Sequence, residues 1–435
     1  APGSGSATSA AAIPTPSQVS VSLLSQNPTA VPLLSISAGE SSSPTVALPS
    51  TISPGSVPTD IPGAPPIPDI SALNPANYPA MDKTPPTDSQ EVQQWIQEVA
   101  NTGINIPNIS VTVGMAACAS NAAAAADQSR CWWTCGGCTR DTDITTCPDQ
   151  YTWGLTYDDG PAFYTPNLLD YLNQVNLKST FFTIGSRILE EPHTLQTEYM
   201  SGHQIGVHTW SHPPLTTMTN DQIIAEFGWT KKITKDILGV TPNTFRPPYG
   251  DIDDRVRAIA TVMGLTPVIW TRISATSTFD TGDFNINGGT ISSTEVISNF
   301  NGIMGNISSI NTGFIVLEHD LYEQTVQLAT DYILPEALAY QPALTIKPVI
   351  TCLNMPLSNA YIETNNNQTN PPPSVSGSAA VTLSSGAPGS VQATGGASAQ
   401  SASAGTAVVP SSHLLAAVLS SGVLGGIIGV GSLLF

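Results

Sequence analysis

Short apolar runs alternate with amphipathic stretches over the middle of the chain, between Cys147 and Cys352. The apolar runs predict β-strands over Thr152–Tyr157, Ser179–Ile184, Gln204–Val207, Pro267–Trp270 and Gly313–Leu317. Apolar residues at helical spacing predict helices over Pro166–Val175, Asp221–Leu238, Asp254–Met263 and Tyr332–Tyr340. Strands that alternate with helices indicate an α/β fold with a parallel sheet, either open or closed into a barrel. In both arrangements, functional side chains belong at the carboxyl ends of the strands.

Residues 1–86 differ in composition, because Pro, Ser, Thr, Ala and Gly predominate. Such a segment cannot bury enough apolar surface to offset the entropy lost on ordering. We therefore expect a disordered stalk that is O-glycosylated, with a bare flexible linker as the alternative. The sequence starts at Ala1 with no apolar leader, so we expect a signal peptide to have been removed.

The charge on the chain is low and negative. The 435 residues include 32 Asp and Glu against 13 Lys and Arg, a formal net charge of -19, and 10% of them are charged. Globular proteins average about 25% charged residues. Because duplex binding depends on clustered Lys and Arg, the composition argues against a nucleic-acid partner and favours neutral or cationic partners.

The last residues form an uncharged apolar tail, 413–435, with no basic residue after it. Small residues at 401–405 and a short spacer precede this tail, within a linker over 361–412 that is rich in Ser, Ala and Gly. This order matches the signal for a glycosylphosphatidylinositol (GPI) anchor, in which the tail is removed. A membrane-spanning segment or a buried helix is the alternative.

Six cysteines and three N-glycosylation sequons, at Asn108, Asn306 and Asn367, indicate the secretory route. Cys147 and Cys352 bracket the ordered region closely enough to suggest a disulfide. The other four cysteines lie in residues 87–146, which we expect to form an extension packed on the barrel. A zinc knuckle in the run CWWTCGGC and a separate carbohydrate-binding module are the alternatives for this region.

Two motifs follow predicted strands and contain possible metal ligands. Asp158 and Asp159 adjoin a Gly160–Pro161 turn, whose bend would let both carboxylates face one pocket, although turn and cap residues are a common alternative. His208 and His212 are four residues apart, a spacing that places both on one face of a helical turn and lets them bind one metal. Two imidazoles and a carboxylate suit a catalytic zinc, whereas a non-haem iron oxygenase uses the same ligand types.

Two further motifs, RPPYG and LEHD, also lie where a predicted strand or extended segment meets a loop. Arg246 can hold a carboxylate in its ionised form, and His319 can donate a proton near neutral pH. A surface arginine and a capping histidine are the simpler interpretations of each residue in isolation. Four such groups at strand ends favour a catalytic site.

The motifs TYDDGP, HTWSH, RPPYG and LEHD, in this order, resemble those of the polysaccharide deacetylases of carbohydrate esterase family 4, which share the NodB homology domain. The resemblance covers roughly residues 148–350, within a predicted domain at 147–360. With the flanks and the tail, it is nearest to fungal, basidiomycete-type, GPI-anchored cell-wall chitin deacetylases. It implies a distorted (β/α) barrel of the NodB type with a metal at its mouth.

The resemblance also implies a role for each motif residue. The metal, expected to be Zn²⁺ with Co²⁺ as the alternative, would be held by Asp159, His208 and His212. Asp158 would be the general base, oriented by Arg246, and His319 would protonate the leaving amine. The remaining assignments are the Tyr249 backbone N–H as an oxyanion donor and Leu317 as part of the acetate pocket.

One motif of the family is missing from the chain. Relatives have an Asp-x-x-Asp-Trp pattern after the strand ending at Trp270, where this sequence has TRISATS. Three residues could orient His319 in its place, namely Asp280, Asp283 and Asp320. The polar insert over 274–293 could form a lip of the substrate groove, with Trp210 and Tyr249 stacking on sugars; core packing is the alternative for Trp210.

The resemblance predicts a secreted enzyme at the plasma membrane and cell wall that deacetylates chitin, a polymer of N-acetylglucosamine, to chitosan and acetate. One alternative is a non-catalytic chitin-binding wall mannoprotein, favoured by the missing motif. Another is a deacetylase of a different acetylated polysaccharide, xylan or peptidoglycan. An iron oxygenase fits poorly, because Asp158, Arg246 and His319 would have no task in it.

Overall fold

Parallel strands occupy the centre of the computed structural model, which describes residues 21–39, 43–48, 51–274 and 276–365. The strands are β1 (Thr152–Gly154), β2 (Thr156–Asp158), β3 (Thr180–Thr183), β4 (Gln204–Val207), β5 (Thr244–Phe245), β6 (Thr266–Pro267), β7 (Phe314–Ile315) and β8 (Thr345–Lys347). They form a five-stranded sheet in the order β2-β3-β4-β5-β6 and a three-stranded sheet in the order β7-β1-β8. Strands β3 and β4 are buried along their whole length, as expected for parallel strands covered on both faces.

The two sheets join into a distorted barrel. Leu155 is the single residue between β1 and β2, so one extended segment contributes to both sheets. On the other side, the Thr271 N–H donates to the Ile315 carbonyl (3.0 Å) and connects the chain after β6 to β7. The predicted α/β barrel is therefore confirmed. Strand β4 has its predicted bounds, β3 and β7 are shorter than predicted, and β6 ends where its predicted run begins.

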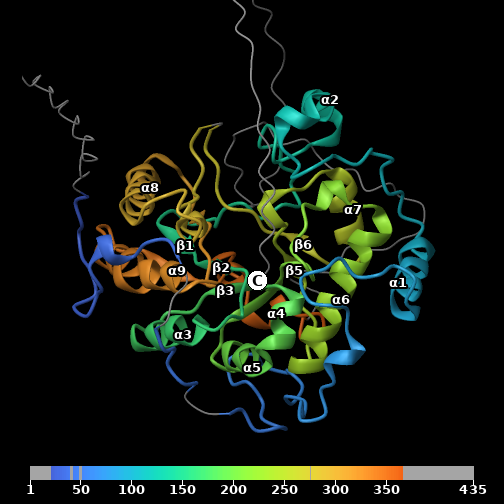
Figure 1. Cartoon of the computed structure of the whole chain (residues 1–435), viewed down its shortest axis with the longest axis horizontal. Coiled ribbons are helices and arrows are strands. Elements are labelled where there is room, and N and C mark those ends of the chain that lie inside the picture. The colour runs from blue at the N-terminus through green and yellow to red at the C-terminus, as the bar shows by residue number, and fades with distance from the viewer. Residues whose placement is uncertain (1–20, 40–42, 49–50, 275, 366–435) are drawn as a thin grey trace, which may run out of the picture. The chain divides into compact units, whose positions relative to one another are not determined.

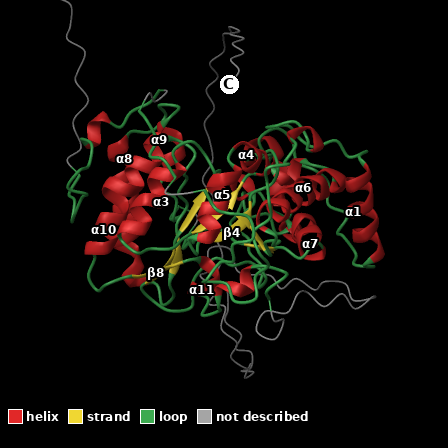
Figure 2. Cartoon of the chain, turned by 90° about the horizontal axis from the view of Figure 1, so that it is seen from below, coloured by secondary structure: helices red, strands yellow, loops and turns green. Residues whose placement is uncertain are grey.

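Helices surround the strands in Figure 1, and Figure 2 shows most of them in two groups on either side of the strands, with α5 and α11 in the middle of the view. The helices are α1 (Gln90–Asn101), α2 (Ala122–Ala126), α3 (Thr165–Gln174), α4 (Gly185–Glu190), α5 (Pro192–Met200), α6 (Asn220–Leu238), α7 (Asp254–Val262), α8 (Ser293–Asn306), α9 (Glu323–Leu328), α10 (Leu334–Ala339) and α11 (Val349–Cys352). Helix α6 begins with a capping box between Thr219 and Gln222 and ends at Gly239, whose φ is 79°. Helices α3, α6 and α7 lie where the periodicity predicts them, and the stretch predicted over 332–340 is the end of a longer α9–α10 segment.

The described part of the Pro-rich N-terminal segment packs on the barrel, which differs from the expected disordered stalk. Ile36, Ile61 and Ile67 are buried in the main core. The Val31 N–H donates to Asp331 (3.0 Å) and the Leu24 N–H to Glu336 (3.0 Å). Gln324 of α9 donates to the Gly39 carbonyl (2.7 Å), so residues 21–39 lie along the continuous helical segment from α9 to α10. Proline restricts the unfolded chain, and such a segment therefore loses less entropy when a few apolar side chains order it.

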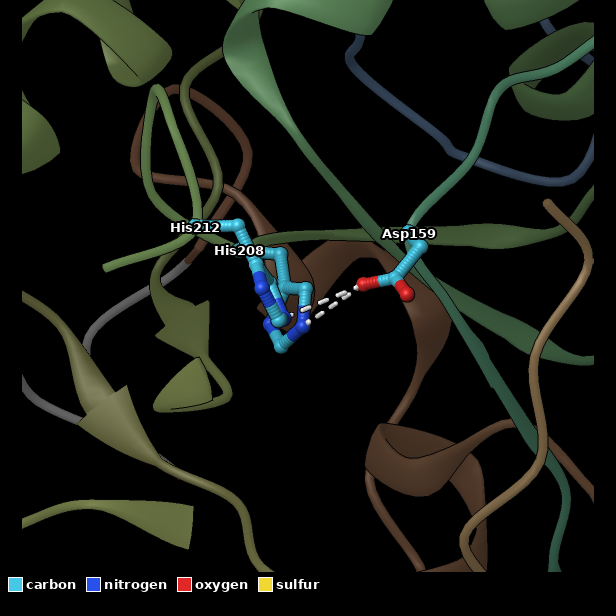
Figure 3. Close-up of side chains that lie close together, drawn as sticks. All are labelled: Asp159, His208 and His212. Atoms are coloured by element: carbon cyan, nitrogen blue, oxygen red, sulfur yellow. Dashed lines mark ion pairs between the residues drawn. The ribbon is translucent and has the colours of Figure 1, made fainter. Parts of the chain in front are cut away.

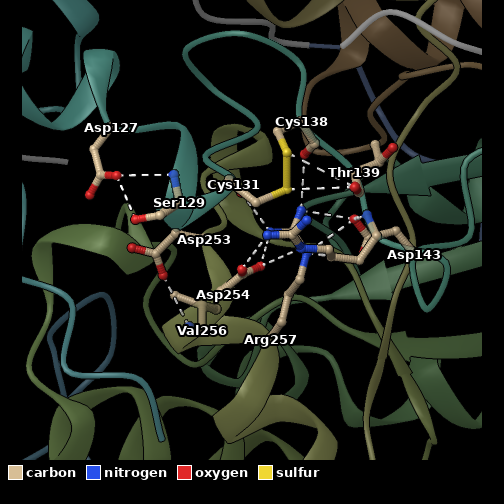
Figure 4. Close-up of polar contacts among 11 residues, drawn as sticks. Asp127, Ser129, Cys131, Cys138, Thr139, Asp143, Asp253, Asp254, Val256 and Arg257 are labelled. Atoms are coloured by element: carbon tan, nitrogen blue, oxygen red, sulfur yellow. Dashed lines mark hydrogen bonds and ion pairs between the residues drawn. A yellow bond between two sulfur atoms is a disulfide. The ribbon is translucent and has the colours of Figure 1, made fainter. Parts of the chain in front are cut away.

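The extension over residues 87–146 is cross-linked internally by two disulfides and attached to the barrel by buried ion pairs. The structure joins Cys118 to Cys135, Cys131 to Cys138, and Cys147 to Cys352, so the predicted Cys147–Cys352 pair forms and the cysteines of CWWTCGGC are not available to a zinc ion. Arg257 of α7 is fully buried, donates to Asp143 (2.8 Å) and lies 3.3 Å from Asp254 (Figure 4).

Asn108 is exposed and Asn306 is half-buried at the end of α8, whereas Asn367 and the predicted anchor signal lie outside the described residues. Among the residues that the structure describes, no helix combines the length and apolar character needed to cross a membrane.

Arg257→Met should lower the free energy of unfolding by about 3–5 kcal/mol, because it leaves the buried carboxylates of Asp143 and Asp254 without this cation. Urea unfolding followed by fluorescence measures the loss. Arg187→Met, which breaks the more exposed pairs with Asp82 and Glu190, should cost less than about 1 kcal/mol. Equal losses in the two variants would contradict this account of the attachment.

Candidate active site

A cavity of about 330 Å³ opens where the carboxyl ends of the strands meet. Its lining residues are Asp158, Asp159, His208, His212, Tyr249, Trp270, Asp280, Gly282, Phe284, Asn285, Leu317 and His319. The structure therefore brings together every residue to which the motifs assign a role in catalysis or metal binding except Arg246, which is fully buried and contacts Asp158. Trp210 is also fully buried and packs against Tyr78 and Trp229, so its interpretation as a sugar-stacking residue is wrong.

The two adjacent carboxylates face one cavity because the chain reverses at Asp159. Strand β2 ends at Asp158, and Asp159 has a left-handed φ of 77°. The bend thus lies one residue before the Gly160–Pro161 turn that the sequence predicts. A left-handed conformation costs a non-glycine residue about 1–2 kcal/mol, and such strain is typical of functional sites.

The two histidines converge through an irregular turn after β4, not through the helical turn expected from their spacing. Thr209 and His212 both have left-handed φ values, of 66° and 59°. The imidazole centroids of His208 and His212 are 4.9 Å apart. Both rings point toward Asp159 (Figure 3), with Nε2–Oδ1 distances of 3.2 Å for His208 and 3.3 Å for His212.

These three side chains fit a divalent metal ion. Their ligand atoms lie within 4.8 Å of one another, and the buried Oδ1 of Asp159 accepts no hydrogen bond from the residues that the structure describes. Donors at about 2.0–2.1 Å around a tetrahedral ion are roughly 3.3 Å apart, which agrees with the observed separations. Burial lowers the pKa of His212 to about 4, so this imidazole is neutral at neutral pH, the form that binds metals.

The orientation of His208 is set by the backbone of Arg246. His208 Nδ1 lies 2.8 Å from the Arg246 carbonyl oxygen, which can only accept, so Nδ1 bears the proton and Nε2 is free to bind a metal.

Glu226 of α6 holds the turn between the two histidines, and sequence reasoning missed it. Its fully buried carboxylate accepts from the Trp210 N–H (2.7 Å), the Ser211 N–H (2.9 Å) and the Ser211 hydroxyl (2.6 Å). Burial raises the pKa of Glu226 to about 7, although these three donors act in the opposite direction. The available signal was an acidic residue within the apolar run IIAEF of the predicted helix.

Arg246 fixes Asp158 through a buried ion pair. Its Nη1 donates to Asp158 Oδ1 (2.9 Å) and to the Thr156 hydroxyl (2.8 Å). The guanidinium carbon lies 4.5 Å from the centroid of the Phe182 ring, so one face of this cation is covered. Because Asp158 is also buried, the pair keeps a carboxylate with defined orientation beside the metal-binding cluster.

Tyr249 and Leu317 lie on the wall of the same cavity. Tyr249 follows the Pro247–Pro248 pair, has a left-handed φ of 59° and packs its ring on His212 at 4.7 Å. Its side chain is 47% exposed, whereas Leu317 is buried at 9%. An apolar wall and an exposed aromatic ring suit a small acyl group and a sugar, respectively.

The sequence offers three aspartates that could orient His319, and Asp283 is the one that contacts it. Its Oδ1 lies 2.7 Å from His319 Nδ1, and its Oδ2 accepts from the His319 backbone N–H (2.8 Å). Asp280 instead accepts from the Gly282 N–H, and Asp320 from the Thr165 hydroxyl. Burial alone would lower the pKa of His319, but Asp283, with Asp158 and Asp159 nearby, raises it to about 10.

Taken together, these groups define the class of protein as a metal-dependent hydrolase. Asp158 and His319 line the same cavity as the ligand cluster, and a carboxylate and a protonated histidine beside a metal serve acid–base chemistry rather than oxygen activation.

Comparison with known proteins gives the family. A family model described as polysaccharide deacetylase matches residues 145–268. Chitin deacetylase 1 of Cryptococcus neoformans var. grubii is 55% identical over 344 residues, which cover 78% of this chain and 72% of that protein. The chain belongs to the polysaccharide deacetylase family, as its motifs predict.

Two other comparisons cover about half of this chain. Chitin deacetylase of Amylomyces rouxii is 40% identical over 243 residues, which are 54% of each chain. The solved structure of the chitin deacetylase from the fungal pathogen Colletotrichum lindemuthianum aligns with a TM-score of 0.46 and 28% identity, over 52% of this chain and 97% of that one.

Glu226→Ala should weaken divalent-metal affinity by about 10- to 100-fold, because the turn that carries the histidines loses three hydrogen bonds. Competition with a metallochromic chelator measures the affinity. Glu98→Ala, on the exposed face of α1, serves as the control and should bind the metal like the unmodified protein. Unchanged affinity in Glu226→Ala would refute its supporting role.

Asp283→Asn should move the alkaline limb of kcat to lower pH by more than about one unit. The carboxylate stabilises the protonated imidazole, so its loss lowers the pKa of His319 and the proton is lost at a lower pH. A pH–rate profile measures the shift. Asp280→Asn, in the same loop but without a bond to His319, should leave the limb in place, and equal shifts in both variants would contradict the assignment.

Proposed function

We propose that this chain is a metal-dependent chitin deacetylase that hydrolyses the N-acetyl groups of N-acetylglucosamine polymers and releases acetate and chitosan. The observation that carries the proposal is the presence in one cavity of a ligand cluster, a separate carboxylate and a histidine that favours its protonated form. The choice of chitin is supported by the 55% identity to a protein named chitin deacetylase 1.

The metal would be held by Asp159, His208 and His212, and we propose Zn²⁺, with Co²⁺ as an ion that the same ligands accept. Two neutral imidazoles and one carboxylate are a usual ligand set of catalytic zinc. When bound, the ion supplies a Lewis acid that polarises the acetyl carbonyl and acidifies water.

Asp158 would act as the general base. It is not part of the ligand cluster, and Arg246 donates to it at 2.9 Å. Its carboxylate accepts a proton from the water molecule whose oxygen bonds to the acetyl carbon. The Tyr249 backbone N–H would donate to the carbonyl oxygen as negative charge develops there, and Leu317 would contact the acetyl methyl group.

His319 would act as the general acid. Its Nδ1 is engaged by Asp283, so the proton on Nε2 is the one that can be transferred. Transfer to the amide nitrogen lets the C–N bond break with departure of a neutral amine. The raised pKa of His319 keeps this proton in place at neutral pH.

We further propose that the protein is secreted and acts at the plasma membrane and cell wall. Three disulfides among the described residues support an oxidising compartment. The apolar tail over 413–435, with small residues at 401–405, supports a GPI anchor.

Acetate release from N-acetylglucosamine oligomers by the full chain tests the activity. Release should require the added metal, stop with a chelator and return when Zn²⁺ is restored. Asp158→Asn should reduce kcat by at least about 10³-fold, because the base is lost while the ligands remain. Asp170→Asn, the same change on the exposed side of α3, should be fully active.

The other outcomes distinguish the alternatives. Release from acetylated xylan or peptidoglycan but not from chitin oligomers would replace the substrate while keeping the chemistry. Tight chitin binding without release from any of the three, by metal-loaded protein, would establish a non-catalytic wall protein.

A further inference from the structure

The loop that contains Tyr249 is fixed by the buried residues that follow Tyr249, and not by the Tyr249 side chain. Residues 248–250 form a short 3-10 turn after β5, and the Tyr249 ring is half exposed and lies on His212. The next residues, Gly250 and Asp251, are buried. Trp132, Trp133 and Thr134 of the Cys-rich extension, which lie outside the four family motifs, contact these two residues.

Asp251 has a fully occupied carboxylate. Its Oδ1 accepts from the Trp132 indole N–H (2.7 Å) and the Thr134 hydroxyl (2.9 Å), both in the extension. Its Oδ2 accepts from the Thr216 N–H (2.8 Å) and the Thr216 hydroxyl (2.7 Å). Asp251 therefore ties the Tyr249 loop to the extension on one side and to the segment after His212 on the other.

Trp133 supports the same loop by packing. Its ring lies against the Cα of Gly250, where a methyl group would collide with it, and Gly250 has a left-handed φ of 64°. The Trp133 N–H donates to the Ile252 carbonyl (3.0 Å). The same ring packs edge-on against Trp270 at 4.7 Å, and Trp270 lines the catalytic cavity.

The two tryptophans are themselves rigidly placed. They lie between Cys131 and Cys138, which form a disulfide. Arg257 donates to the carbonyl oxygens of Cys131 (2.7 Å) and Cys138 (3.1 Å) while it pairs with Asp143 (Figure 4). A clamp made of a disulfide and a buried cation leaves the indoles little freedom to move, and a group held by such a shell retains its geometry well.

We propose that Trp132 and Trp133 of the extension are positioning residues for catalysis, which hold the Tyr249 backbone N–H at the developing oxyanion. The inference rests on the proposed function, in which this N–H is an oxyanion donor. An oxyanion donor is worth about 10²–10³ in kcat, and displacement of a catalytic group by about 1 Å can cost 10²-fold. The extension is thus part of the catalytic apparatus, although it touches no reacting atom.

Trp132→Phe tests the proposal, because it retains an aromatic ring and removes the N–H that binds Asp251. We expect kcat to fall by about tenfold or more, with KM for chitin oligomers and Zn²⁺ affinity unchanged. A phosphonate analogue of the tetrahedral intermediate should lose affinity by the same factor as kcat, which a loss of stability alone would not produce. Trp95→Phe, on α1 of the same extension and packed on Trp229, should keep the full kcat.

Thr134→Val is the second variant, since it removes the extension's other donor to Asp251 Oδ1, at a half-buried position, and changes little volume. It should lower kcat in the same direction as Trp132→Phe. Folded, metal-loaded variants with the kcat of the unmodified enzyme would overturn the inference while leaving the deacetylase assignment intact. Absence of acetate release from the unmodified enzyme would instead overturn the proposed function.

Discussion

The organisation of the active site depends on one buried cation, Arg246. Its side chain donates to Thr156 and Asp158, the first and last residues of β2. Its backbone N–H donates to the Val207 carbonyl at the end of β4, and its own carbonyl fixes His208. A buried guanidinium that loses its partner costs several kcal/mol. The strand ends must therefore assemble around Arg246 for the chain to fold, and the same assembly orients the proposed base and one proposed ligand. Stability and catalytic geometry are in this way a single requirement.

The carboxylate beside His319 comes from the polar insert and not from the residues directly after Trp270. The polar insert over 274–293 supplies Asp283 to His319, and it also places Phe284 and Asn285 on the wall of the cavity. Phe284 packs on the His319 ring at 5.2 Å. A change in this insert should therefore act on two properties together, the pKa of His319 and the shape of the cavity wall.

The barrel does not hold its active-site loops alone. The extension contributes the indoles behind the Tyr249 loop, and its buried arginine–aspartate pairs attach it to α7. The described part of the N-terminal segment contacts the loop that carries His208 and His212. Trp210 lies between these two histidines, and its indole N–H donates to the Ala80 carbonyl (3.1 Å). The N-terminal segment and the extension, which the sequence predicts to be a stalk and a cap, thus help to fix the two loops that carry the proposed metal ligands and the proposed oxyanion donor.

The sequence by itself determined the parallel α/β barrel, its family and the residues that gather at the strand ends, because apolar runs and motifs such as TYDDGP are local properties. The tertiary structure decided which aspartate contacts His319. Asp283 lies 36 residues away in the sequence, and two other aspartates were equally good candidates. It also decided the role of Glu226 and the left-handed turns at Asp159 and His212. The sequence did not predict strands β5 and β8, which form through pairing with β4 and β6 and with β1, respectively. Packing of the Pro-rich segment was unpredictable for the same reason: the surface that orders it belongs to α9 and α10, about 300 residues further along the chain.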